Sequence, residues 1–405
     1  MNTAGQVCRS LIAGLFFISV LLPAQGAEFP MPAPGNDLIG EVYTVAVREG
    51  ETLLDIARDH GLGYNEIIAA NPGIDPWLPH PGTKITIPAR YVLPNGPRTG
   101  IVVNLAEMRL YYYPPAKEGA PRTVMTFPVG IGQEGWATPT GKARILVKDK
   151  DPVWTVPESI LAESIAEGDP LPRVVPPGPD NPLGKYALRL DMVGYLIHGT
   201  NKPYGVGRRI SHGCIRMYPE DIEVLFDRVE VGARVEIINQ PYKLGLDGDA
   251  LYLESHEPVF DRGEPAPSNL PQVLQTLAVI TKAARREAIK AQAVNEASRH
   301  DGIPHHLHDV RVDTMEAHGG AGWMLQVGAF TNAGNARQVA YDLDWVEVPI
   351  SIRVGLEDGY CRVLIGPFPA EWQARDALWR IVKEGGVKGY IYPASRHGSL
   401  LRCVS

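Results

Sequence analysis

The sequence is organised around two runs of residues, Tyr195-Leu-Ile-His198-Gly199-Thr200 and, a short spacer later, Ser211-His212-Gly213-Cys214-Ile215-Arg216-Met217. A thiolate nucleophile needs a base or a cation close by, which lowers the pKa of the thiol, and backbone N–H donors for the developing oxyanion. Glycine allows the backbone to come close to a substrate. The cluster therefore predicts a catalytic cysteine. The alternative is a buried structural cysteine beside two ordinary histidines.

Short apolar runs rich in β-branched residues lie on both sides of this cluster, and turn residues separate them. This pattern predicts a mainly-β, sandwich-like or barrel-like catalytic domain over residues 97–240. Pro219 suits the first turn of a helix within it. The proline-rich stretch 152–182 is either a loop over a peptide groove or a plain surface excursion. The expected strands are 100–113 (two strands with a turn at 106–107), 123–130, 143–148, 186–190, 194–198 and 234–238.

Length and charge limit the classes of protein to which this chain can belong. Its 405 residues are enough for two to four domains, and 36 prolines with 42 glycines indicate many turns. The formal net charge of -7 argues against nucleic acid as a general partner.

The N-terminal residues 1–26 have the pattern of a secretory signal peptide. Arg9 precedes an apolar run, 11–22, that is too short to span a membrane comfortably, and small residues follow at a cleavage position. This predicts export to the periplasm; the alternative is an uncleaved membrane anchor. Cleavage would leave Cys361 and Cys403 able to pair in an oxidising compartment, with Cys214 as a free thiol.

Residues 40–90 predict a small module with the order β-α-α-β. Thr52 and Asp55 have the spacing of a capping box at the start of the first helix. The runs Gly50-Glu-Thr-Leu-Leu-Asp-Ile-Ala57 and Pro81-Gly-Thr-Lys-Ile-Thr-Ile-Pro88 resemble those of a LysM module. The resemblance implies binding of the N-acetylglucosamine-containing glycan of cell walls. The alternative is a packing domain without a ligand.

The C-terminal third divides into a predicted linker and a predicted domain. Residues 241–320 are interpreted as a linker with an amphipathic helix, and 321–394 have the order β-α-β-β-α-β, a ferredoxin-like pattern. Gln326-Val-Gly-Ala-Phe330 and Arg362-Val-Leu-Ile-Gly-Pro-Phe368 resemble the two signatures of SPOR domains. That resemblance implies binding of peptidoglycan glycan strands without stem peptides, and the alternative is another ligand on the same fold.

A histidine-rich run, His305-His-Leu-His308, falls within the predicted linker. It lacks partner cysteines, so we interpret it as incidental composition and expect neither a metal nor another cofactor.

The opening cluster is similar to the active-site pattern of the YkuD-type L,D-transpeptidases, over the whole of about 97–240. In that family a histidine and a spacer precede Ser/Thr-His-Gly-Cys-hydrophobic-Arg/Asn, and Thr138-Pro-Thr-Gly141 adds a secondary match. The departure is Tyr218-Pro219, where relatives often carry a small polar residue.

The resemblance implies a mechanism on peptidoglycan. Cys214 would attack the carbonyl that joins meso-diaminopimelate to the terminal D-alanine of a tetrapeptide stem, and an amine would then take the acyl group. The resemblance implies that His198 is the general base and acid and that the Gly199 carbonyl orients its ring. It also implies that the N–H groups of His212, Gly213 and Cys214 donate to the oxyanion and that Ser211 supports the motif. Arg216 would bind a substrate carboxylate, orient the loop or form a structural ion pair.

Two histidines compete for the role of base. His198 cannot share a turn with Cys214, so the two meet only if the strand ending at His198 lies beside the cysteine loop. His212 is two residues before Cys214 and is the alternative base. We favour His198.

Three function hypotheses follow for this chain. The first is a periplasmic L,D-transpeptidase that binds stem peptides and glycan strands and forms 3→3 cross-links. The second keeps the enzyme but changes the acceptor to a lipoprotein lysine or, as an L,D-carboxypeptidase, to water. The third is a non-catalytic wall-binding scaffold, against which an intact Cys214/His198 pair argues.

Overall fold

The computed structural model describes residues 27–402 except for 34–35, 97, 117–118, 249, 262–267, 281–285, 310–321, 331–334, 337–338, 340–342, 344–349, 356–359, 369, 386–388 and 394–399. The expected signal peptide and Cys403 lie outside the described residues, so export and the pairing with Cys361 stay predictions. Among the residues that the structure describes, no helix is both long and apolar enough to cross a membrane.

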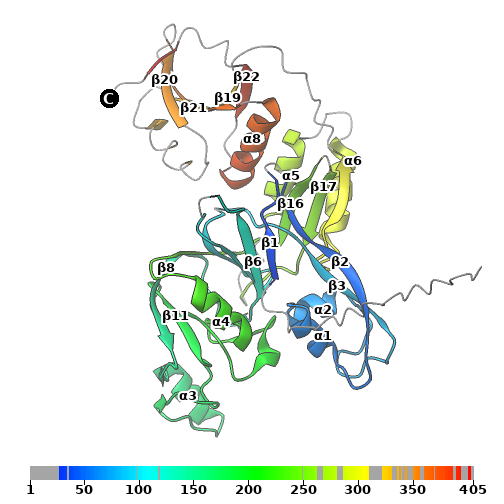
Figure 1. Ribbon diagram of the computed structural model, residues 1–405, viewed down its shortest axis with the longest axis vertical. Helices are drawn as coiled ribbons and strands as arrows, with labels where there is room; N and C mark the ends of the chain where they lie inside the picture. Colours follow the sequence, from blue (N-terminus) through cyan, green and yellow to red (C-terminus); the bar gives the residue numbers. More distant parts are fainter. Residues whose placement is uncertain are drawn as a thin grey trace, which may run out of the picture.

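The catalytic region is one nine-stranded sheet in the order β1-β6-β5-β4-β15-β8-β11-β12-β14 (Figure 1). Phe127 near one edge and Ile215 at the other belong to one buried cluster, together with Ile222 of helix α4 (Pro219–Arg228). A flat sheet would keep its edges apart, so this sheet curls around a single core. Its strands are β1 (Ala27–Pro30), β4 (Gly100–Asn104), β5 (Arg109–Tyr113), β6 (Thr123–Pro128), β8 (Gly141–Lys150), β11 (Tyr186–Leu190), β12 (Leu196–His198), β14 (Ile215–Arg216) and β15 (Arg234–Ile238).

This single sheet differs from the two stacked sheets of a sandwich. The reason is strand β15, the last of the region. It pairs in parallel with β4 on one side and antiparallel with β8 on the other. It therefore joins two groups of strands that local sequence patterns could not connect.

The N-terminal module consists of β2 (Leu38–Ala46), α1 (Leu53–Asp59), α2 (Tyr64–Ala69) and β3 (Lys84–Val92). As the sequence predicts, Thr52 caps α1 and forms a capping box with Asp55. Ile56 and Ile67 of the module share a buried cluster with Val102 and Tyr111 of the catalytic sheet. The module is therefore packed against the catalytic region rather than tethered to it.

The described residues between 242 and 309 form a folded layer, where the sequence predicts a linker. Strands β16 (Tyr242–Asp247), β17 (Ala250–Ser255) and β18 (His305–Asp309) make a sheet, and helices α5 (Leu270–Ile280) and α6 (Arg286–Ala297) pack on it. Leu253, Leu277 and Ala293 share its core. β16 and β17 follow each other closely, but β18 comes only after both helices, and strands this short give little alternation in the sequence. His305 lies in β18 with Nε2 2.9 Å from an Asp301 oxygen.

The C-terminal module has a five-stranded sheet in the order β22-β19-β21-β20-β23, with helix α8 against it. It lies at one end of the long axis of the molecule, opposite helix α3 (Glu158–Ala166) (Figure 1). Its elements are β19 (Trp323–Phe330), β20 (Ile350–Gly355), β21 (Cys361–Phe368), α8 (Glu371–Gly385), β22 (Tyr390–Pro393) and β23 (Leu400–Arg402). Most of the helix expected after β19 lies outside the described residues.

Candidate active site

Parallel pairing of β12 with β14 brings the two halves of the sequence motif together. Ile197 is opposite Ile215 and His198 is opposite Arg216. The Met217 N–H also donates to the His198 carbonyl at 2.9 Å. Because Cys214 immediately precedes β14, the register places it across from Leu196, so the strand that ends at His198 lies beside the cysteine turn. This is the arrangement that the sequence required for His198 to act on Cys214.

The turn that presents Cys214 is closed by hydrogen bonds within the motif. The Ser211 hydroxyl, on β13 (Arg209–Ser211), donates to the Cys214 carbonyl at 2.6 Å. Gly213 has a φ of 97°, in the region that favours glycine, and a Cβ there would lie 2.8 Å from Tyr195 Cε1. The motif therefore needs glycine at 213 for both backbone conformation and space.

Thr138 supports this turn from a different part of the sheet. Its hydroxyl donates to the Gly213 carbonyl at 2.9 Å and accepts from the Gly132 N–H at 2.9 Å. The sequence analysis noted Thr138 only as a secondary motif match. Its structural role depends on a contact between distant segments.

The Cys214 thiol is protonated in this conformation. Sγ donates to the Gly194 carbonyl at 3.7 Å, and burial raises the pKa of the thiol. Within the described residues, Sγ makes no hydrogen bond to His198 or His212. Formation of the thiolate therefore requires the side chain to leave Gly194, as is common for catalytic contacts that tighten only with substrate.

His198 is buried and neutral at neutral pH. Its Nδ1 lies 2.6 Å from the Gly199 carbonyl oxygen, so Nδ1 carries the proton and Nε2 is left with its lone pair. Burial, with the positive charge of Arg216 as a second cause, lowers the pKa of His198 to about 3. A neutral, oriented imidazole is the form that can accept a proton from a thiol.

His212 faces away from this arrangement, toward helix α3. Its Nε2 lies 2.5 Å from Glu163 Oε2, and the edge of its ring packs on Trp136 with centroids 4.9 Å apart. Glu163 comes from the proline-rich excursion, which also contains β9 (Trp154–Thr155) and β10 (Val174–Val175). The excursion therefore touches the nucleophile motif, as the groove-covering alternative requires.

Arg216 is a cation of the same motif. Its charge acts on both Cys214 and His198. Its Nε is buried and, within the described residues, has no hydrogen-bond partner. An unsatisfied buried donor of this kind is expensive, which is consistent with a place for a substrate oxygen.

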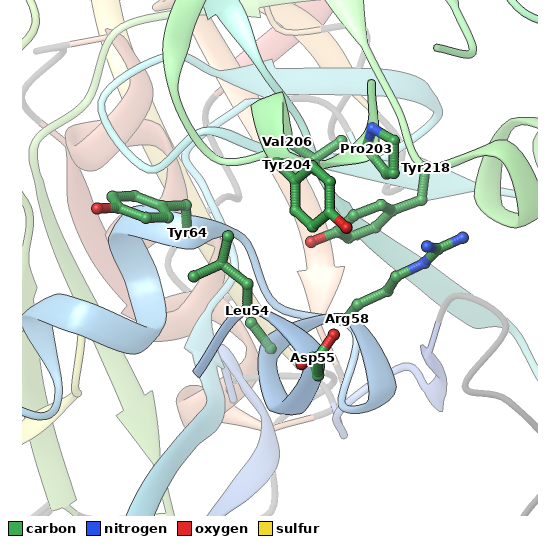
Figure 2. A pocket seen from close by; sticks show the side chains of 9 residues that line it. Leu54, Asp55, Arg58, Tyr64, Pro203, Tyr204, Val206 and Tyr218 are labelled. Atoms are coloured by element: carbon green, nitrogen blue, oxygen red, sulfur yellow. The ribbon is translucent and has the colours of Figure 1, made fainter. Parts of the chain in front are cut away.

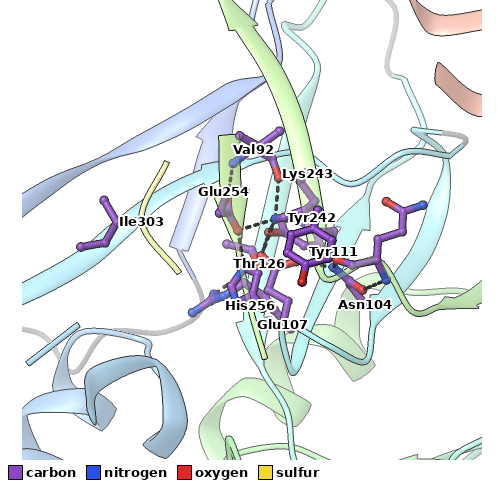
Figure 3. Close-up of polar contacts among 12 residues, drawn as sticks. Val92, Asn104, Glu107, Tyr111, Thr126, Tyr242, Lys243, Glu254, His256 and Ile303 are labelled. Carbon is purple, nitrogen blue, oxygen red and sulfur yellow. Dashed lines mark hydrogen bonds and ion pairs between the residues drawn. The ribbon is translucent and has the colours of Figure 1, made fainter. Parts of the chain in front are cut away.

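A second cluster of buried charged groups lies outside this site (Figure 3). Glu107, Glu254 and His256 could together offer ligand atoms to a metal ion. Lys243 Nζ, however, lies 2.8 Å from Glu107 and 2.7 Å from Glu254, and it also donates to the Val92 carbonyl. The ammonium supplies the positive charge that these carboxylates need, so the cluster ties three parts of the chain together without requiring a metal.

A hollow of about 50 Å³ lies where the N-terminal module meets the catalytic region (Figure 2). Arg58 of α1 crosses it to pair with Glu220 at 2.7 Å and lies over the Tyr218 ring. The Tyr64 N–H donates to the Val206 carbonyl at 3.1 Å, and both residues line the hollow. The module thus contacts the loop that separates His198 from Ser211.

The comparisons with known proteins agree with this site. Family models match at residues 98–237 (L,D-transpeptidase catalytic domain), 319–393 (SPOR domain) and 45–88 (LysM domain). The probable L,D-transpeptidase YcfS of Escherichia coli (strain K12) is 40% identical over 300 residues, which cover 73% of this chain and 89% of that protein. The probable L,D-transpeptidase YbiS of the same strain is 40% identical over 280 residues, which cover 66% of this chain and 90% of that protein.

This chain belongs to the YkuD family of L,D-transpeptidases. It is a peptidoglycan L,D-transpeptidase with a LysM and a SPOR domain. Its catalytic domain is the curled sheet described above.

One residue in contact with the motif has no local signal in the sequence. Glu163 lies in a stretch recognised only as a long loop, and no local pattern connects it with His212. A carboxylate inside a loop over an active site is the sole signal that could have singled it out.

Proposed function

We propose that Cys214 attacks the carbonyl that joins meso-diaminopimelate to D-alanine in a tetrapeptide stem. The thioester forms as the amide C–N bond breaks and D-alanine leaves; an amine then attacks the thioester, takes the acyl group and frees the Cys214 sulfur. The observation that supports this assignment best is the parallel β12–β14 pair, because the strand that ends at His198 runs alongside the strand that follows Cys214.

His198 is the general base and acid in this proposal. Its Nε2 accepts the thiol proton when Cys214 turns away from Gly194, and it later returns the proton to the leaving D-alanine amine. His212 is supported less well, because its Nε2 is held by Glu163. The N–H groups of Gly213 and Cys214 lie in the strained turn and are the candidate oxyanion donors.

Arg216 is the candidate for the substrate carboxylate. Its buried Nε lacks a partner within the described residues, and a stem peptide carries free carboxylates close to the bond that breaks. A carboxylate bound there would be oriented by a charge-assisted hydrogen bond.

The two flanking modules are proposed to hold the enzyme on its polymer. The N-terminal module has the β-α-α-β order of LysM and the C-terminal sheet has the ferredoxin-like order of SPOR, so we assign both to glycan strands. A polymeric substrate of this kind places the enzyme outside the cytoplasm, and we propose the periplasm.

Incubation of purified wall with the full chain tests the proposal. We expect 3→3 cross-linked dimers among the released muropeptides, and none with Cys214→Ala. Shortened stems without dimers would instead establish the carboxypeptidase, attachment of a lipoprotein peptide would establish the anchoring enzyme, and no change would establish the scaffold.

A further inference from the structure

Helix α3 places a carboxylate beside the nucleophile turn. Glu163 Oε2 lies 2.5 Å from His212 Nε2, and His212 precedes Cys214 by two residues. The Glu163 side chain is 34% exposed. Within the described part of the chain, His212 is its only ion-pair partner, since the nearby Arg173 pairs with Glu158. One face of this carboxylate is thus open to a ligand.

The position of Glu163 is fixed by the excursion around it. Asn181, which is 1% exposed, donates to the Pro152, Val175 and Pro176 carbonyls and so clamps both ends of the excursion. Next to Glu163, the Ser164 hydroxyl donates to the Leu161 carbonyl and accepts from the Leu171 N–H. Such a framework holds a side chain in one place, as recognition of a substrate requires.

The second half of the reaction needs a group that attracts an amine. The acceptor arrives as an ammonium at neutral pH, and it competes with water for the acyl-enzyme. A carboxylate near the thioester raises the local concentration of ammonium groups but does nothing for water.

We propose that Glu163 binds the ammonium of the acceptor and thereby favours transpeptidation over hydrolysis. The proposal rests on the acyl-enzyme of the proposed function. The bound ammonium loses one proton to the Glu163–His212 pair, which passes it to solvent. The free amine attacks the thioester carbonyl, the C–N bond forms and the C–S bond breaks. The second proton of the amine goes to the sulfur of Cys214.

The same geometry separates the two substrates by charge. Arg216, on β14, is the cation whose charge acts on Cys214, whereas Glu163 is an anion that contacts His212, on the other side of Cys214 in the sequence. A donor carboxylate and an acceptor ammonium would thus each meet a group of opposite charge. Neutral nucleophiles would gain nothing from Glu163.

The test compares Glu163→Gln with Glu158→Gln, a matched change on the same helix at a side chain that is 78% exposed and pairs with Arg173. The full chain is given disaccharide-tetrapeptide as donor and acceptor. Cross-linked dimer, hydrolysed tripeptide and the rate of D-alanine release are measured, and hydroxylamine, which is neutral at pH 7, serves as a second nucleophile.

For Glu163→Gln we expect the ratio of dimer to tripeptide to fall roughly tenfold through a higher KM for the acceptor, because a charge-assisted bond becomes a neutral one. D-alanine release in the first half-reaction and capture by hydroxylamine should not change, and Glu163→Asp should recover part of the ratio. Glu158→Gln should behave as the parent.

Three results would overturn the proposal. One is an unchanged ratio in Glu163→Gln. Another is an equal loss with amine, water and hydroxylamine, which would mean that Glu163 only positions His212. A third is the same fall in Glu158→Gln. Absence of any acyl-enzyme in the parent chain would instead refute the proposed function itself.

Discussion

Glu66 of the LysM domain holds Arg109 of the catalytic sheet through two hydrogen bonds, from Nε to Oε1 at 2.9 Å and from Nη2 to Oε2 at 3.0 Å. Both side chains are buried, and the Arg109 guanidinium also donates to the Gly61 carbonyl and lies over the Tyr91 ring. The backbones approach so closely that a Cβ on Gly63 would lie 2.6 Å from Gly207 Cα. The LysM domain and the catalytic sheet are therefore one structural unit.

Removal of Glu66 should destabilise this unit strongly. Glu66→Ala leaves the buried Arg109 charge without a counterion, so we expect a loss of about 3–5 kcal/mol in the free energy of unfolding. Urea denaturation measures it. Glu41→Ala, at an exposed position of the same domain, should change stability by less than about 0.5 kcal/mol. Equal effects of the two substitutions would contradict the interpretation.

Removal of the Lys243 ammonium from the second buried cluster should lower the free energy of unfolding by a comparable amount. Lys243→Met leaves Glu107 and Glu254 buried without their cation, and we expect a loss of about 3–5 kcal/mol. Thermal and urea unfolding check this. The exposed Lys84→Met is the control, and a near-neutral Lys243→Met would show that the carboxylates find protons or water instead.

Gly213→Ala should remove activity more than stability. The substitution is strained by the positive φ and by the contact with Tyr195, so the Cys214 turn must shift. A small displacement of a reacting group can lower turnover by roughly 100-fold. Gly232→Ala is the matched control, because Gly232 has a φ of 87° with nothing within 4 Å of its added Cβ. Gly232→Ala has the same unfavourable positive φ but no steric contact, so this variant should keep the turnover of the parent.

Alkylation of Cys214 should report a protonated thiol. Burial raises the pKa of this thiol, so its rate of reaction with iodoacetamide should still be climbing at about pH 8.5, where an ordinary thiol is half ionised. Mass spectrometry of the Cys214 peptide follows the reaction in the intact chain. A plateau reached by pH 7 would reveal a resting thiolate–imidazolium pair and would contradict the expectation.

His198 should make the protein sensitive to acid. Its folded-state pKa of about 3 is below its unfolded value, so the unfolded chain binds the proton first. Stability is therefore lost as the pH falls from about 6.5 toward 3. When the pH is lowered from 7 to 4.5, the free energy of unfolding should fall by roughly 2 kcal/mol less in His198→Gln than in the parent protein. The exposed His80→Gln should follow the parent curve.

The sequence by itself determined the chemistry and most of the local elements. The order Ser211-His212-Gly213-Cys214 predicts the nucleophile, and the capping of α1 by Thr52 and the start of α4 at Pro219 depend on neighbouring residues. Such features depend on contacts a few positions apart, which sequence spacing encodes directly.

Only the tertiary structure decided how distant segments meet. Strand β15 joined the strands of the expected sandwich or barrel into one curled sheet. The described residues between 242 and 309 form a folded layer because β18 pairs with β17 across the two intervening helices. The partners of the two histidines were decided the same way: β12, which ends at His198, pairs with the strand that follows Cys214, whereas His212 meets Glu163 of a distant helix. Hydrogen-bonded partners far apart in the chain leave no periodic signal in it, so these contacts had to be seen in the fold.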